Sequence, residues 1–209
     1  FMLMAGVNFT LHFVAMKRGF SVMTYLRDDE FRTYAKWMVT LVLLVGALTL
    51  LSGKGEWHEV IFNTVSIATT TGFAVSDYAL WPPGTGLLLF AAMFVGACAG
   101  STGGGMKVVR VLLLFRQGMR EIRRLIHPHA VIHVKIGGER ITDTVVQALW
   151  GFFVLYMVCY GVIATMLAFT GVDMLTALSA TAACLTNTGP GFGEVGPAST
   201  YADLPHAAK

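Results

Sequence analysis

Long apolar segments constrain this chain more than any other feature. The segments at 34–51, 85–99 and 144–169 carry almost no charge, and the last exceeds the roughly 20 residues that an α-helix needs to cross a bilayer. A fourth apolar segment occupies 1–16. Only 13% of the residues are charged, about half the share in a soluble domain, and the mean hydropathy is +0.65. The sequence therefore predicts an all-α membrane protein.

Basic residues gather in two of the segments between these apolar stretches. The segments 17–36 and 107–140 together hold 13 of the 15 lysines and arginines. Short basic segments stay on the cytoplasmic side of a membrane, so we expect these two inside and the acid-bearing segments 53–84 and 170–209 outside. Nucleic-acid binding is the alternative for the basic segments. It is disfavoured because the charges flank the apolar spans as membrane orientation requires.

Two shorter apolar segments repeat one pattern. Each begins with an acid (Glu56 or Asp173), continues for about 16 residues and stops at a glycine (Gly72 or Gly189). At 1.5 Å per residue, a helix of this length is too short to cross the membrane and return. An offset of 117 residues superposes both acids and both glycines. The pattern predicts two copies of one unit, built from an outer helix, a short half-helix, a glycine loop and an inner helix.

The loop after each half-helix is the candidate site. Residues 69–73 read TTTGF and residues 187–193 read NTGPGFG. Irregular backbone at membrane depth is tolerated only where protein or water satisfies it, so each loop implies a cavity. An extended Thr-Thr-Gly backbone can turn carbonyl oxygens towards an axis and replace the hydration shell of a monovalent cation. A simple helix cap and glycine turn is the alternative for either loop alone, but two copies in equivalent positions favour the cation site.

A cluster of glycines interrupts the segment expected to form an inner helix. Residues 96–105 read GACAGSTGGG, with five glycines in ten residues. Each glycine costs about 1 kcal/mol relative to alanine inside a helix, so we expect the helix to break there. A break that serves only close helix packing is the alternative reading. Beyond this point, the spacing of basic and apolar residues predicts a helix over 107–127, and Gly137-Gly138 predicts a two-residue hairpin turn.

Three motifs carry a resemblance to a known family. IATTTGF at 67–73, GACAGSTGGGMKVVR at 96–110 and TNTGPGFG at 186–193 resemble the Trk/Ktr potassium transporter family, and the match covers essentially the whole chain. The resemblance implies four helix–pore-loop–helix repeats around a single pore, similar to potassium channel pores. This sequence would then hold the end of the second inner helix (1–16), a cytoplasmic linker (17–33), the third repeat (34–115), a cytoplasmic amphipathic segment and hairpin (116–143), and the fourth repeat without its inner helix (144–209).

The resemblance also implies roles for individual residues. Potassium filter positions would be Thr70, Thr71, Gly72, Phe73, Asn187, Thr188, Gly189 and Pro190. Of these, Thr70, Thr71, Asn187 and Thr188 would bind K⁺ through backbone carbonyls. An intramembrane gate beneath the filter would comprise Gly100, Ser101, Thr102, Gly103, Gly104, Gly105 and Lys107. A single glycine per strand departs from the TVGYG pattern of potassium channels, which predicts weaker discrimination against sodium.

The function that the resemblance implies is potassium uptake by a multi-pass protein of the plasma membrane, the inner membrane in bacteria. K⁺ would be the transported ion, with no cofactor and no enzymatic chemistry. The implied partners are a second copy of the protein, membrane lipid and a cytosolic nucleotide-binding regulatory ring (TrkA-like) that contacts 107–140; no nucleic acid is implied. A secondary transporter of a small solute that uses re-entrant loops is the alternative, disfavoured because the repeats share one topology instead of being inverted. An intramembrane enzyme is disfavoured because HExxH and GxSxG motifs are missing.

Overall fold

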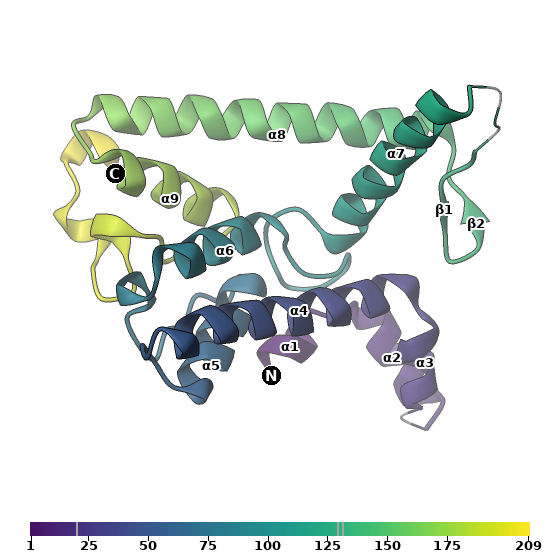
Figure 1. Ribbon diagram of the computed structural model, residues 1–209, viewed down its shortest axis with the longest axis horizontal. Helices are drawn as coiled ribbons and strands as arrows, with labels where there is room; N and C mark the ends of the chain where they lie inside the picture. The colour runs from purple at the N-terminus through teal and green to yellow at the C-terminus, as the bar shows by residue number, and fades with distance from the viewer. Residues whose placement is uncertain (20, 129, 131) are drawn as a thin grey trace.

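A computed structural model describes residues 1–19, 21–128, 130 and 132–209, and in these residues the chain is mostly helical, with irregular segments between the helices (Figure 1). The sheet found among them is one two-stranded hairpin. The secondary structure therefore agrees with the prediction of an all-α protein.

Two helices are long and apolar enough to cross a membrane, namely α4 (Asp29–Leu51, 23 residues) and α8 (Asp143–Phe169, 27 residues). Helix α4 begins five residues before the apolar segment predicted at 34–51. It does so because the carboxylate of Asp28 accepts a hydrogen bond from the backbone N–H of Phe31 (2.7 Å) and caps the helix. Most apolar side chains of α8 are exposed, as expected for a helix that meets lipid.

The remaining predicted span, at 85–99, is wrong in its length and in where it ends. Helix α6 (Pro83–Phe94) has only 12 residues, and the chain is irregular until α7 (Val108–Ile126) begins. The backbone folds back on itself here, because a Cβ atom on Gly96 would lie 2.0 Å from the carbonyl oxygen of Gly104. The break predicted from the glycine cluster is thus confirmed, but it starts earlier and extends further than the glycines alone indicate.

The apolar segment 1–16 is also interrupted. Its elements, with the helix that follows, are α1 (Met2–Ala5), α2 (Phe9–Lys17) and α3 (Val22–Arg27). The side chain of Asn8 accepts a hydrogen bond from the backbone N–H of Thr10 (2.8 Å), so Asn8 caps a new helix where the pattern predicted continuous apolar structure.

Both predicted half-helices are present, α5 (Trp57–Ala68) and α9 (Met174–Leu185), each with 12 residues. The acids predicted at their starts act as caps. Glu56 forms a capping box with Glu59, and the carboxylate of Asp173 accepts from two backbone N–H groups at 3.1 and 3.3 Å. Such caps stabilise a helix by about 1 kcal/mol each, and an acid also complements the positive end of the helix dipole.

The half-helices lie at the same end of the molecule, α5 beside α4 and α9 beside α8, with α6 between the two pairs (Figure 1). Aromatic pairs join the two units. The rings of Tyr78 and Phe192 are 5.4 Å apart and those of Phe94 and Tyr160 are 5.2 Å apart, both in T-shaped contact. The two copies of the predicted unit therefore run in the same direction and pack directly on each other.

The segments after the half-helices carry short 3₁₀ helices. These are η1 (Tyr78–Leu80), η2 (Gly193–Val195), η3 (Tyr201–Asp203) and η4 (His206–Ala208). A small buried cluster formed by Val172, Ala180, Val195 and Leu204 holds the C-terminal segment against α9. This segment therefore lies close to the loop that follows α9.

The opposite end of the molecule carries the hairpin predicted around Gly137-Gly138. Its strands are β1 (Lys135–Ile136) and β2 (Glu139–Arg140), and the turn glycines have φ angles of 57° and 87°, as a type I′ turn requires. The hairpin lies near the basic helix α7 (Figure 1), and both the helix predicted over 107–127 and the turn predicted at Gly137-Gly138 are confirmed.

Candidate functional site

The loops after α5 and α9 have the same unusual backbone. Thr70 and Asn187 are the non-glycine residues with positive φ among those described, at 55° and 56°. Two residues further on, Gly72 and Gly189 also have positive φ, at 83° and 101°. A β-branched residue such as threonine rarely adopts this conformation, and such strain persists only where the surroundings impose it. The offset of 117 residues found in the sequence thus relates these four residues as well.

Matching hydrogen bonds hold both loops to their half-helices. The backbone N–H of Thr71 donates to the carbonyl oxygen of Ser66, and that of Thr188 donates to the carbonyl oxygen of Ala183, both at 2.8 Å. Each hydrogen bond closes a six-residue π-turn at the end of an α-helix, and the turn is the same at both places. The two loops are therefore equivalent in structure, although their sequences differ.

Hydroxyl pairs reinforce each turn. The hydroxyl oxygens of Thr69 and Thr71 are 2.8 Å apart, and those of Thr186 and Thr188 are also 2.8 Å apart. The first hydroxyl of each pair also donates to a carbonyl of its own half-helix, at 2.7 and 2.8 Å. The hydroxyls of these four threonines are thus bound locally, and they fix the backbone of each loop.

The two loops meet at Gly72. A Cβ atom there would lie 2.0 Å from the carbonyl oxygen of Thr188 and 3.2 Å from the Cδ atom of Pro190. A side chain at this position cannot be accommodated unless the backbone moves, quite apart from the strain of a positive φ. Phe73, next along the chain, is 68% exposed. The structure therefore brings the predicted residues of the two loops together, with Phe73 at the margin.

The glycine-rich loop between α6 and α7, residues 95–107, passes against both threonine–glycine loops. The backbone N–H of Gly104 donates to the hydroxyl of Thr70 at 2.6 Å. A Cβ on Gly104 would lie 1.9 Å from the carbonyl oxygen of Thr186, and a Cβ on Gly103 would lie 3.2 Å from that of Thr69. Side chains larger than hydrogen are excluded at Gly104, which explains a glycine there. We call residues 95–107 the gate loop, after the role predicted for them.

Not all predicted gate residues face the threonine–glycine loops. The hydroxyl of Ser101 donates to the carbonyl oxygen of Cys98 within the same loop, and the hydroxyl of Thr102 donates to that of Ala5 (3.2 Å). Gly100 contacts the N-terminal segment, because its carbonyl accepts from the backbone N–H of Phe9 at 3.1 Å. The ammonium of Lys107 donates to the carbonyl of Gly103 and closes the loop.

Several residues outside the motifs also hold the site. The hydroxyl of Tyr201 donates to the carbonyl oxygen of Gly189 at 2.7 Å, and Ser179 exchanges two hydrogen bonds of 2.9 Å with the backbone of Phe192. Burial raises the pKa of Tyr201, so its phenol stays protonated and remains a donor. Asn63 binds the chain beyond the first loop, where its side-chain oxygen accepts from the backbone N–H of Val75 at 3.0 Å. No sequence motif marks these residues.

The chemistry of the site is that of backbone dipoles. Both half-helices end at the loops, so the negative ends of their dipoles point at the space beside them, which favours a cation. Within the described part of the chain, no three His, Cys, Asp or Glu side chains come together as they would to hold a divalent metal. The arrangement can therefore coordinate a weakly hydrated monovalent cation through carbonyl oxygens, and it offers no general acid or base for covalent chemistry.

The fold and these loops define an all-α membrane protein built from repeated helix–pore-loop–helix units. A family model described as "Cation transport protein" (TrkH) matches residues 1–209, and the chain belongs to this family. The members of this family are described as cation transport proteins.

Relatives in the family are similar along the whole chain. Proteins named "Trk system potassium uptake protein TrkH" from Halomonas elongata and Vibrio parahaemolyticus are 43% and 45% identical to it, over 100% of this chain and 44% of their own length. The crystal structure of the potassium transporter TrkH from Vibrio parahaemolyticus superposes with a TM-score of 0.91 at 44% identity, covering 99% of this chain and 45% of that one. The predicted fold class is confirmed, and the chain spans less than half the length of these relatives.

Proposed function

We propose that this chain is part of a potassium uptake protein and that its two threonine–glycine loops are two strands of an ion-selectivity filter. One observation carries the proposal: two loops with the same left-handed residues and the same hydrogen bonds meet at the C-terminal ends of two half-helices. Because the chain spans less than half of its relatives, the remaining strands would come from the rest of the whole protein. The division of this chain into the end of a second repeat, a third repeat and most of a fourth repeat stays a prediction.

In this proposal, the carbonyl oxygens of Thr70, Thr71, Asn187 and Thr188 replace the water around a potassium ion. Gly72 and Gly189 permit the turn of the backbone, and Phe73 and Pro190 border the outer edge. The hydroxyl pairs described above support this assignment, because they bind the threonine side chains to their own half-helices and leave the backbone to contact the ion.

The gate loop is proposed to restrict ion passage beneath the filter. Gly103 and Gly104 support this role most directly, since they lie against the residues at which the two filter strands begin. Gly100, Ser101 and Thr102 would hold the loop from its other side, while Gly105 and Lys107 close it. Gly105 fits this role, because its φ of 63° is one that glycine adopts without strain.

The partners also remain proposals. The relatives are named as parts of a Trk system, which supports a cytosolic nucleotide-binding regulatory ring as partner, with the basic segment 107–140 as its contact surface. A homodimer embedded in lipid is proposed by the same resemblance. A small-solute carrier built on inverted repeats is not favoured, because α5 and α9 lie at the same end of the molecule (Figure 1).

The test is rubidium uptake by the full-length parent in cells that lack their own potassium uptake systems. Gly72→Ser places a side chain against the carbonyl of Thr188, whereas the matched control Gly84→Ser places its Cβ at an ordinary 3.7 Å from Leu48. At equal membrane abundance, we expect Gly72→Ser to lose uptake or its preference for rubidium over sodium, and Gly84→Ser to keep both. Unchanged uptake and selectivity in Gly72→Ser would overturn the filter assignment.

A further inference from the structure

Two adjacent acids at the start of α4, Asp29 and Glu30, contact parts of the chain that lie far away in sequence. A carboxylate oxygen of Glu30 accepts a hydrogen bond from the backbone N–H of Ala99, inside the gate loop, at 2.6 Å. Glu30 thus contacts the gate loop, and helix α7, into which that loop continues, packs against α4.

Other contacts on this side of the gate loop include backbone hydrogen bonds, beside the one that the hydroxyl of Thr102 donates to Ala5. Within the described residues, the N–H of Cys98 donates to the carbonyl of Gly6 at 2.9 Å, and the N–H of Thr102 donates to the carbonyl of Ala5 at 3.3 Å. Backbone hydrogen bonds of this kind position the loop, but a side-chain substitution does not remove them. The contact with Glu30 is a short hydrogen bond to a carboxylate, so it is among the strongest on this side.

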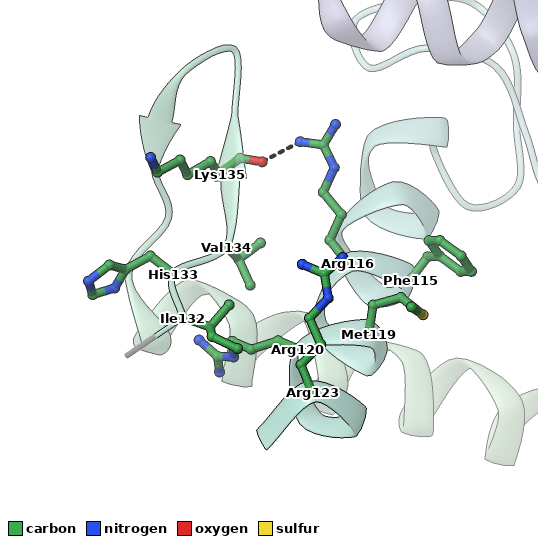
Figure 2. Close-up of a pocket in the computed structure, with 9 residues that line it drawn as sticks. All are labelled: Phe115, Arg116, Met119, Arg120, Arg123, Ile132, His133, Val134 and Lys135. Carbon is green, nitrogen blue, oxygen red and sulfur yellow. Dashed lines mark hydrogen bonds between the residues drawn. The ribbon is translucent and has the colours of Figure 1, made fainter. Parts of the chain in front are cut away.

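Asp29 makes the second set of contacts. Its carboxylate accepts from the backbone N–H of Gly137, at the tip of the cytosolic hairpin, at 3.0 Å, and lies 3.7 Å from the guanidinium of Arg116 on α7. Figure 2 shows that Arg116 also donates to the carbonyl oxygen of Lys135, in the first strand of that hairpin. A rigid first turn of α4 therefore connects the hairpin, through Asp29, with the gate loop, through Glu30.

We propose that Glu30 is a positioning residue that holds the gate loop against the filter strands, and that Asp29 couples this contact to the cytosolic hairpin. The proposal rests on the proposed function, because it requires that the gate loop controls ion passage. A regulatory protein that moves the hairpin would act on Asp29 and α7, and the shared helical turn would transmit the change to Ala99. Coupling of this kind is a property of two sites that bias one element, and it can be measured.

The experiment is rubidium uptake by the full-length parent in proteoliposomes, expressed as maximal flux per molecule, half-saturating concentration and preference over sodium. Loss of a charge-assisted hydrogen bond shifts a two-state equilibrium by about tenfold, so we expect Glu30→Ala to raise the maximal flux by up to about tenfold. Glu30→Gln, which keeps a neutral acceptor, should give a smaller increase. The half-saturating concentration and the selectivity should stay constant, because the filter strands keep their own contacts. Damage to the fold lowers flux and cannot produce this pattern.

Asp29→Asn should raise the flux in the wild-type background and have no further effect in Glu30→Ala, because Asp29 acts through Glu30. Glu139→Gln, on the exposed second strand of the hairpin, is the matched control and should behave as wild type. Unchanged or reduced flux per molecule in both Glu30 variants would overturn the role of Glu30, and additive effects of the two acids would overturn the coupling. If Gly72→Ser leaves uptake and selectivity unchanged in the same assay, the filter proposal itself fails, and this inference fails with it.

Discussion

Two buried serines, one in each half-helix, should differ in how much replacement by alanine changes the thermal stability. The hydroxyl of Ser179 accepts from the backbone N–H of Phe192 and donates to its carbonyl oxygen, both at 2.9 Å, and Ser179 is fully buried. The hydroxyl of Ser66 is equally buried but has no hydrogen-bond partner in the part of the chain that the structure describes. Removing the hydroxyl of Ser179 leaves two backbone groups unpaired, whereas removing the hydroxyl of Ser66 leaves none.

The magnitude follows from the cost of an unpaired buried polar group, about 1–3 kcal/mol. Ser179→Ala orphans both backbone groups of Phe192, which is 7% exposed, so we expect a loss of about 2–3 kcal/mol. At roughly 2–4 °C for each kcal/mol in a domain of about this size, and less in the longer full-length parent, the thermal midpoint falls by up to about 5–10 °C. Ser66→Ala removes a polar group that is already unsatisfied, so its midpoint should stay within about 2 °C of wild type or rise.

The assay is thermal unfolding of the purified full-length parent in detergent, followed by the fraction that remains monodisperse after heating. Ser179→Cys, which keeps a weak donor and acceptor, should fall between wild type and Ser179→Ala. Equal losses in Ser66→Ala and Ser179→Ala would refute the reasoning, because the cost would then come from the lost volume and not from the hydrogen bonds.

Three further substitutions test the contacts around the loops. Tyr201→Phe removes the donor to the carbonyl of Gly189, next to the proposed ion-binding carbonyls, and we expect a change of about 2- to 10-fold in half-saturating rubidium, corresponding to about 0.5–1.5 kcal/mol; an unchanged value would count against this contact. Asn63→Ala should lower the thermal midpoint in detergent because it removes the acceptor of the N–H of Val75, a residue that is 52% exposed, at a cost of about 0.5–1.5 kcal/mol. Gly104→Ala should alter maximal rubidium flux, since its Cβ would lie 1.9 Å from a carbonyl oxygen, whereas Gly118→Ala, a site on α7 with no described atom within 4 Å, should not.

Sequence reasoning succeeded where the signal is local. The half-helices were predictable because an acid, a run of apolar residues and a glycine lie within one short segment, as at Asp173 and Gly189. The hairpin turn was predictable for the same reason. The matched left-handed residues Thr70 and Asn187 were not, because threonine gives no local indication that surrounding structure will force a positive φ.

The rest depends on contacts between distant residues. The hydrogen bond from Tyr78 to the carbonyl of Gly191 joins residues 113 positions apart, and that from Ala99 to Glu30 joins residues 69 apart. No periodic pattern marks such partners, since the hydrophobic pattern of α4 shows only that it is apolar and long. The early end of α6 has the same origin, because the loop after it is shaped by Gly104, at the far end of the glycine cluster.

Because the two equivalent loops lie within one chain, their sequences can evolve independently. A pore assembled from identical subunits repeats every substitution at each subunit, so its strands can only change together. Here the left-handed position is threonine in one loop and asparagine in the other, and asparagine tolerates that conformation at lower cost. Each loop can therefore acquire substitutions alone, so one side of the site can change its contacts with the gate loop while the other keeps the shared backbone geometry.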